Sequence, residues 1–329
     1  MIDISFIVPL YNQEAYILPC LNSIVDSGLH PDQYEVIVWN DGSTDNSEAL
    51  VAEFVKQQSN IRLVTNTNHG VSSSRNQALR LAVGRYVWFV DSDDMVNSGS
   101  VKDLLAYSMT ANLEMLAFNW KSLLPDGRFE PGIHHITDSP VQSGRDVYVN
   151  TIITMAPWSF LYKRDFLLTN NLTFPENYKT CEDIQFNQKA LFLAEKVAMS
   201  SQVGYIYRHL HSSATKGQGN TVVNDQIRRL KDELEWFSGK NDAEFLHTIV
   251  YRNLREINVW LAWADKDDRW FDLIRQILKG YTIIIKVNVS TIFVWLMKHF
   301  PKQVYLVQRW MNRLRRTIVL KLSGCLTKG

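Results

Sequence analysis

Three carboxylates stand within four residues at the end of a short apolar run. The run is Tyr86–Val90, and Asp91, Asp93 and Asp94 follow it. Divalent cations such as Mg²⁺ and Mn²⁺ prefer oxygen ligands and commonly bridge to the phosphates of a substrate. A strand here would deliver these oxygens to the carboxyl end of a sheet, where open α/β sheets bind their ligands. An isolated Asp-x-Asp is also common in solvated turns and helix caps, so the interpretation depends on the neighbouring motifs.

Two further apolar segments end in polar residues. Tyr11 and Glu14 follow Ile4–Val8, and Asp41 follows Tyr34–Trp39. These ends can converge on one crevice, where the Asp41 carboxylate can accept the N–H of a nucleobase and Tyr11 can pack on its ring. The alternative is structural, because Asp-Gly-Ser-Thr-Asp also suits a turn with a helix cap, and Glu14 also suits the first turn of a helix.

A third motif adds positive charge. Gly70 and Val71 precede three serines and Arg75. This order predicts the start of a helix, where backbone N–H groups bind anions and an arginine adds its charge. The alternative is a serine-rich cap with Arg75 in solvent.

Alternating strands and helices are expected to position these residues. Between residues 2 and 95 we predict strands over Ile4–Val8, Tyr34–Trp39, Ile61–Val64 and Tyr86–Val90, with helices from Glu14, from near Thr44–Ser47 and over Ser72–Val83. This alternation indicates an α/β fold with a mainly parallel, buried central sheet and right-handed crossovers.

The remainder of the chain is less regular. Between residues 96 and 215 we predict helices near Ser100–Thr110 and Asp183–Ala194, and strands near Glu114–Trp120 and Tyr205–Arg208. Residues 222–280 have a mostly helical pattern with repeated aromatics, and the segment before them contains two glycines without large apolar residues. We therefore expect a boundary near residue 220.

Composition and cysteine usage limit the class of protein. The 329 residues are 46% hydrophobic and 21% charged, which is typical of a globular protein of one or two domains. The three cysteines are widely spaced, which excludes a zinc pattern or a disulfide framework and favours a reducing compartment. We expect no signal peptide, and the apolar stretch Tyr281–Met297 is interrupted by Lys286 and Asn288, so it falls short of a spanning helix.

Together the polar motifs resemble those of the family-2 glycosyltransferases, which have the Rossmann-like GT-A fold. The matching segments, in the order and spacing of that family, are Ser5–Glu14, Val38–Asp45, Asn68–Gly70 with Ser74–Asn76, and Asp91–Asp94. The resemblance covers roughly residues 1–215. Asn40 stands where many members of the family have an acidic residue. The resemblance assigns nucleotide binding to Asp41, so this difference weakens the predicted nucleotide site little.

The resemblance implies a nucleotide-diphospho-sugar donor, with a UDP-sugar as the first expectation. Asp41 would face the base, Asp91 would approach the ribose or the sugar, and Asp93 would bind Mn²⁺ or Mg²⁺, which neutralises the diphosphate as it leaves. The remaining residues assigned to the donor site are Pro9, Tyr11, Glu14, Gly70, Arg75 and Arg208.

An inverting transferase also needs a base for the acceptor hydroxyl. The pair Glu182–Asp183 resembles the family's Glu-Asp pair at a helix start, with Asp183 as the base and Glu182 on the acceptor side; the alternative is an N-terminal charge pair. Trp158 can stack on an acceptor sugar or pack in the core. His211 lies in a segment where many relatives have a loop that closes on the diphosphate. It can therefore contact phosphate or metal, although loop histidines usually do neither.

The charge distribution singles out the end of the chain. Residues 1–272 carry 24 basic and 34 acidic residues, a net charge of −10, whereas residues 273–329 carry 11 basic and none acidic. In Lys302–Leu322, an apolar stripe recurs at helical spacing beside basic residues, which favours an anionic membrane surface; the alternative is a helix that covers the core. Nucleic acid is not expected, since no matching motif is present.

The sequence thus predicts three regions: a GT-A glycosyltransferase domain over 1–220, a helical extension over 221–280 and a basic amphipathic, membrane-associating tail over 281–329. We expect an enzyme that is peripheral on the cytoplasmic face of the cell membrane and extends a glycan or lipid-linked glycan for surface polysaccharide. One rival is a nucleotidyltransferase, but no glycine-rich loop with Lys or Arg follows the first strand. The other is an inactive nucleotide-sugar-binding module.

Overall fold

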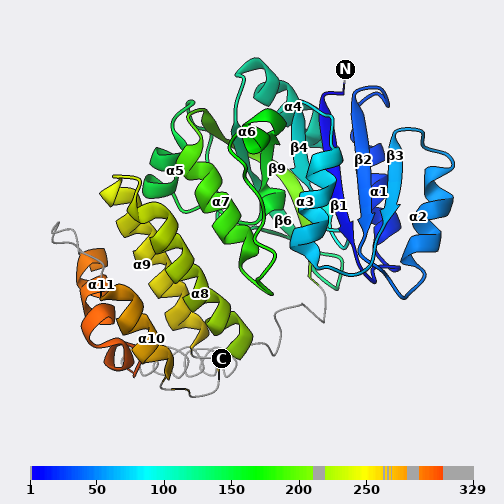
Figure 1. Cartoon of the computed structure of the whole chain (residues 1–329). Coiled ribbons are helices and arrows are strands. Elements are labelled where there is room, and N and C mark those ends of the chain that lie inside the picture. Colours follow the sequence, from blue (N-terminus) through cyan, green and yellow to red (C-terminus); the bar gives the residue numbers. More distant parts are fainter. Residues whose placement is uncertain are drawn as a thin grey trace, which may run out of the picture. The chain divides into compact units, whose positions relative to one another are not determined.

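The computed structural model describes residues 2–209, 219–261, 264, 267, 269–279 and 289–306 (Figure 1). The chain divides into two compact units. Residues 1–178 and 182–213 form the first unit, and residues 179–181 and 214–329 form the second, which we call the helical unit.

The first unit is built on a mixed sheet. Its strands follow the order β3-β2-β1-β4-β8-β6-β9-β5, with β7 paired to β6. Their bounds are β1 Ile4–Leu10, β2 Tyr34–Asn40, β3 Ile61–Thr65, β4 Tyr86–Phe89, β5 Met95–Val96, β6 Met115–Leu123, β7 Phe129–Pro131, β8 Phe160–Lys163 and β9 Val197–Arg208. Strands β1 to β4 pair in parallel, whereas β8 pairs antiparallel with both β4 and β6.

Helices lie on both faces of this sheet (Figure 1). They are α1 Ile17–Val25, α2 Ser47–Val55, α3 Val71–Leu81, α4 Ser98–Thr110, α5 Gly144–Asn150, α6 Arg164–Thr169 and α7 Glu182–Leu193. All seven residues of β1 are buried, as expected of a central parallel strand covered on both sides. The four predicted N-terminal strands and the helices between them are confirmed, with ends shifted by a few residues.

A glycine allows β4 to lie close to β1. A Cβ added to Gly84 would come within 2.4 Å of the Ser5 backbone nitrogen, and the Gly84 N–H donates to Ser5 Oγ at 2.8 Å. The approach therefore depends on the missing side chain. It sets the register in which Ile7 pairs with Phe89, just before the carboxylates that follow β4.

The helical unit contains α8 Gly219–Ser238, α9 Ala243–Trp260, α10 Arg269–Leu278 and α11 Val289–His299. Its core includes residues on both sides of position 280, since Val294, Met297 and Tyr305 are buried together with residues of α8, α9 and α10. These three residues lie beyond the predicted division at residue 280, yet they share one core with the helical extension. Of the amphipathic stripe expected in Lys302–Leu322, only Val304 is described, and it packs against that core. The remainder of the stripe lies outside the described residues.

No helix within the described ranges combines the length and the apolar character that a membrane crossing requires.

Candidate functional site

Three neighbouring parallel strands end at one edge of the sheet. Leu10 of β1 pairs with Asn40 of β2, and Ile7 pairs with Phe89 of β4. Because parallel strands present their carboxyl ends on the same side, the segments that carry Tyr11, Asp41 and Asp91 emerge together. Pro9 lies within β1 and is buried, so the strand runs two residues beyond the predicted end.

Asp41 holds the loop between β3 and α3. Its side chain is 4% exposed; Oδ1 accepts the His69 N–H and Oδ2 accepts the Gly70 N–H, each at 2.8 Å. Each carboxylate oxygen has a further lone pair, so these bonds leave acceptor capacity for a nucleobase N–H. Gly70 has a φ of +89°, which a residue without a Cβ adopts readily. The Asp41 carboxylate thus brings the start of α3 to the same edge.

The segments after β1 and β2 are tied to each other. Glu14 Oε2 accepts the Asn46 N–H at 2.9 Å, and Asp45 Oδ2 accepts the Glu14 N–H at 3.0 Å. Asn12, which the sequence did not single out, has a φ of +53° and accepts the Thr44 N–H at 2.7 Å. Glu14 therefore braces a loop, whereas the Tyr11 side chain is 48% exposed beside it.

Three carboxylates crowd the end of β4. Burial, and then the charge of Asp91, raise the pKa of Asp93 to about 6. Burial, and then the charges of Asp93 and Asp91, raise the pKa of Asp94 well above its ordinary value, although Asp94 Oδ1 accepts the Arg208 N–H at 2.7 Å. Such a cluster favours a compensating cation.

Arg208 supports the backbone of this cluster. Its Nε donates to the Asp93 carbonyl at 2.9 Å, and its guanidinium lies 5.2 Å from the centre of the Tyr16 ring. The side chain is partly exposed and already donates to the Asp93 carbonyl. The contact of Arg208 with a donor phosphate stays a prediction.

Two residues that the sequence did not single out lie beneath the cluster. The hydroxyl of Tyr205, on β9, accepts the Asp91 N–H at 3.0 Å, and the thiol of Cys20, on α1, faces the Asp91 carbonyl at 3.7 Å. Both are buried. No local sequence pattern predicts these two contacts, since each joins residues more than 70 positions apart.

Arg75 joins Asp91, which we predict on the donor side, to Glu182, which we predict on the acceptor side. Its Nη2 donates to Asp91 Oδ1 at 2.8 Å and its Nη1 to Glu182 Oε1 at 3.0 Å, and its guanidinium lies 5.2 Å from the Phe174 ring centre. Burial by itself would lower the pKa of Arg75, but Asp91 and Glu182 outweigh it and raise the pKa. The residue is 4% exposed. This burial excludes the solvated side chain, whereas the predicted contact of Arg75 with the donor stays a prediction.

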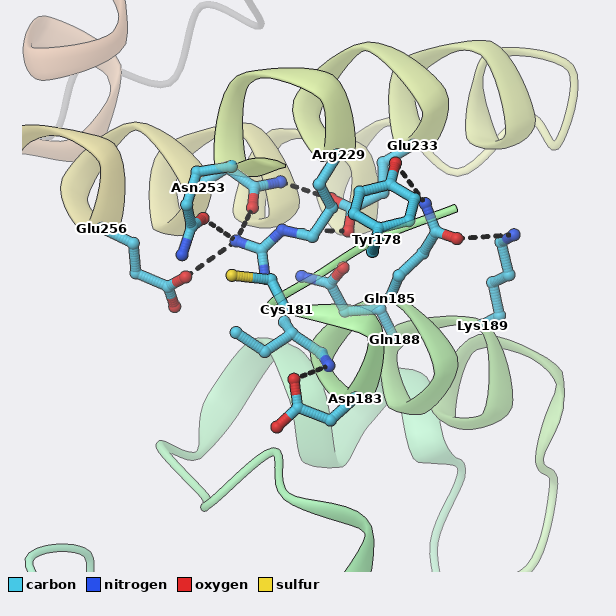
Figure 2. Close-up of polar contacts among 12 residues, drawn as sticks. Tyr178, Cys181, Asp183, Gln185, Gln188, Lys189, Arg229, Glu233, Asn253 and Glu256 are labelled. Atoms are coloured by element: carbon cyan, nitrogen blue, oxygen red, sulfur yellow. Dashed lines mark hydrogen bonds and ion pairs between the residues drawn. The ribbon is translucent and has the colours of Figure 1, made fainter. Parts of the chain in front are cut away.

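Glu182 and Asp183 begin α7, as predicted. Asp183 Oδ1 accepts the N–H of Ile184 at 2.8 Å, and Figure 2 shows the bond. Since Glu182 shares Arg75 with Asp91, the predicted acceptor pair lies beside the acidic cluster of β4.

Trp158 lies in the core. It is 6% exposed, its ring stacks on that of Tyr205 with centroids 4.6 Å apart, and its carbonyl accepts Trp88 Nε1–H at 2.9 Å. This position favours the packing role over stacking on a sugar, because Tyr205 already covers one face of the ring.

The predicted metal ligands are only partly described. His211 lies outside the described residues. In the ranges that the structure does describe, no group of three or more His, Cys, Asp or Glu is arranged to hold a metal ion. Burial and the charge of Asp91 both raise the pKa of Asp93, so a nearby cation would favour its charged form.

Comparison with known proteins identifies a consistent set of relatives. Residues 5–168 match the family model "Glycosyl transferase family 2". The chain is 31% identical over 231 residues to "Uncharacterized glycosyltransferase EpsJ" of Bacillus subtilis, covering 69% of this chain and 67% of that protein. It is 32% identical over 226 residues to "Poly(ribitol-phosphate) beta-N-acetylglucosaminyltransferase TarS" of Staphylococcus aureus, covering 67% of this chain but only 36% of that longer protein.

A solved structure shares the fold. Residues 1–349 of S. aureus TarS, crystallised with UDP-GlcNAc, match with a TM-score of 0.70 and 24% identity over 84% of this chain and 81% of that one. This likeness confirms the GT-A fold.

Proposed function

Since this chain belongs to glycosyl transferase family 2, we propose that it transfers a sugar, with inversion, from a nucleotide-diphospho-sugar to a hydroxyl of a glycan or lipid-linked glycan. The donor we expect is a UDP-sugar, as in the complex of its structural neighbour TarS with UDP-GlcNAc. The relatives include one N-acetylglucosaminyltransferase and one glucosyltransferase of poly(ribitol-phosphate), so a hexosyl or an N-acetylhexosaminyl group is the proposed cargo.

One observation carries this proposal. Arg75 binds Asp91 on the donor side and Glu182 on the acceptor side with two separate nitrogens, at 2.8 and 3.0 Å. A transferase needs its leaving group and its acceptor hydroxyl on opposite faces of one sugar carbon, held close together. The shared arginine supplies this proximity between residues that are far apart in the sequence.

The donor would lie along the edge formed by β1, β2 and β4. The exposed Tyr11 ring offers a face for the base, and Asp41 retains lone pairs for a base N–H. Asp91 would face the ribose or the sugar.

Asp93 fits the role of a metal ligand. A carboxyl whose pKa is raised to about 6 by burial and by the charge of Asp91 gains from a cation, and phosphate oxygens of the donor would complete the ligand set. Bound Mn²⁺ or Mg²⁺ would supply positive charge for the departing diphosphate.

Asp183 would take the proton from the acceptor hydroxyl. It follows Glu182 at the start of α7, and Glu182 pairs with Arg75, so we assign proton transfer to Asp183 and not to Glu182. Glu182 would position the acceptor side through its ion pair.

We further propose that the enzyme works at the cytoplasmic face of a membrane. The support is the charge of residues 273–329, with 11 basic and no acidic residues. Anionic lipid attracts such residues by about 1 kcal/mol each near its surface. A lipid-linked glycan for surface polysaccharide would be presented there.

The test is a panel of nucleotide-sugars with a lipid-linked or soluble glycan acceptor, read out as release of nucleoside diphosphate. We expect acceptor-stimulated release with one UDP-sugar, loss of release in EDTA, and recovery with Mn²⁺ or Mg²⁺. Pyrophosphate release from a nucleoside triphosphate and a sugar phosphate would indicate a nucleotidyltransferase instead. Binding of UDP-sugars without release under any condition would indicate an inactive binding module.

A further inference from the structure

The carboxylates after β4 lie on one tight turn. The Asp94 N–H donates to the Asp91 carbonyl at 3.0 Å, which is the hydrogen bond that closes a β-turn of four residues. The N–H of the preceding residue, Val90, donates to the Ile7 carbonyl of β1 at 2.9 Å, and β5 begins directly after the turn. The turn thus passes from the end of one strand of the sheet to another, and it carries both Asp91 and Asp93.

Strand β9 holds the later part of this turn. Val96 of β5 pairs with Tyr205 of β9 in an antiparallel ladder. Further along β9, the Arg208 N–H donates to Asp94 Oδ1 at 2.7 Å, and Arg208 Nε donates to the Asp93 carbonyl at 2.9 Å. These contacts bind the turn from Asp93 onward.

The hydroxyl of Tyr205 reaches the first residue of the turn. Its oxygen accepts the Asp91 N–H at 3.0 Å, and the Cys20 thiol faces the Asp91 carbonyl at 3.7 Å. The carboxylate of Asp91 is bound separately, because its Oδ1 accepts a hydrogen bond from Arg75 Nη2 at 2.8 Å. The amide of Asp91 is therefore held by Tyr205, and its side chain is held by Arg75.

The Tyr205 ring has little freedom to move. It is fully buried and stacks on the Trp158 ring, with the centroids 4.6 Å apart and the planes at 8°. The Trp158 carbonyl in turn accepts the Nε1–H of Trp88, on β4, at 2.9 Å. Because packed interiors resist displacement, the hydroxyl is a fixed point between β9 and the strand that the turn follows.

The position of Asp91 affects Asp93. The charge of Asp91 contributes to the raised pKa of Asp93, so the two carboxylates lie close enough to interact. The spacing between them therefore decides how strongly a cation at Asp93 also interacts with the charge of Asp91. Hydrogen bonds that orient the residues around a metal matter for its binding, and their loss commonly lowers metal affinity by about 10- to 100-fold.

We propose that Tyr205 is a positioning residue whose hydroxyl holds the Asp91 peptide and so sets the spacing of the Asp91 and Asp93 carboxylates around the metal and the donor diphosphate. This inference rests on the proposed metal-assisted transfer from a nucleotide-diphospho-sugar. Tyr205 acts through Asp91 and touches neither donor nor acceptor, because the core encloses its side chain.

Tyr205→Phe in the full chain tests this role. The substitution removes one oxygen and retains the ring that stacks on Trp158, so the fold should persist. Calorimetric titration of the UDP-bound chain with Mn²⁺ measures the Kd of the metal. We expect this Kd to rise by about 10-fold, because the lost bond orients the backbone of the acidic turn. The Kd of UDP in EDTA should change less than about twofold, since Tyr11 and Asp41 follow other strands.

Tyr86→Phe is the matched control. Tyr86 is also fully buried, and its hydroxyl donates to the carbonyls of Ser108 and Leu113 at 2.6 and 3.0 Å. It lies at the start of β4, at the other end of the strand from the turn. Its loss should lower Tm at least as much as Tyr205→Phe does, because two buried carbonyls lose a donor, while the Kd of Mn²⁺ stays within about twofold of wild type. An equal rise of this Kd in both variants would overturn the proposal, since general destabilisation would then explain it.

Amide hydrogen exchange gives a readout that needs neither metal nor turnover. In the metal-free full chain, Tyr205→Phe should speed exchange of the Asp91 amide, which loses its acceptor. The Val90 amide, bonded to the Ile7 carbonyl, should exchange as in wild type. Unaltered exchange at Asp91 would refute the holding role.

Two outcomes separate the role of Tyr205 from the proposed function. A wild-type chain that binds UDP and Mn²⁺ but releases no nucleotide from any sugar donor would refute the transferase activity. An active wild type whose Mn²⁺ affinity is unchanged in Tyr205→Phe would refute only the role of Tyr205.

Discussion

Replacing Arg75 by methionine should destabilise the first unit and reduce transfer. The side chain is 5% exposed and pairs with Asp91 at 2.8 Å and Glu182 at 3.0 Å. Methionine has a similar length and favours helices, so α3 itself should persist. The change mainly leaves two carboxylates without their shared partner.

The magnitude follows from burial. Removing one partner of a buried ion pair costs about 3–5 kcal/mol. The Asp91 side chain is 28% exposed and that of Glu182 is 13% exposed, so water screens part of the loss and the lower end applies. In a unit of about 210 residues, 1 kcal/mol shifts Tm by about 2–4 °C, so the expected fall is about 6–12 °C.

Thermal unfolding followed by circular dichroism measures this shift. The control is Arg80→Met on the same helix, where the exposed side chain bonds only Gln77 among the contacts described and the loss should stay within about 0.5 kcal/mol. Arg75→Lys retains the charge but cannot reproduce the forked geometry, so it should fall between wild type and Arg75→Met. A Tm for Arg75→Met no lower than that of the control would refute the reasoning, as would an unchanged kcat.

Three further predictions follow from the site and the charge pattern. Because folding raises the pKa of Asp93 from 3.8 to about 6, the metal-free chain should lose stability as pH rises from about 4 to about 6. Asp93→Asn should reduce this loss and leave the part due to Asp94, whose pKa is also raised; Tm in EDTA across that range checks it. Asp183→Asn should keep the affinity for UDP while lowering kcat by about 10²–10⁴-fold, and an equal collapse of affinity would assign Asp183 a binding or structural role. Truncation after Leu306 should preserve nucleotide release but weaken sedimentation with anionic vesicles, and wild-type attachment should weaken in high salt; a truncated chain that still sediments equally would contradict the membrane role.

The sequence alone determined which edge of the sheet carries the chemistry. Apolar runs that end in polar residues identify strands, and alternation with helices makes these strands parallel, so the segments with Tyr11, Asp41 and Asp91 must emerge on one side. The motifs also specify the family, which the comparisons support. These are local patterns with a fixed geometric consequence.

Only the tertiary structure decided how the other side chains are used. The pairing of Arg75 with Glu182 and of Tyr205 with the Asp91 backbone joins residues more than 100 positions apart, and no local periodicity encodes such a contact. Trp158 is equally compatible with a sugar platform and a core until its neighbours are known, and burial against Tyr205 favours the core.

The end of the chain illustrates the same limit. A helix that binds lipid and a helix that packs on protein can have the same sequence pattern, an apolar stripe beside basic residues. Both partners remove the same apolar surface from water. Val294, Met297 and Tyr305 pack into the helical unit with α8, α9 and α10. The identity of the partner is a property of three-dimensional packing, and for Val294, Met297 and Tyr305 that partner is the helical unit.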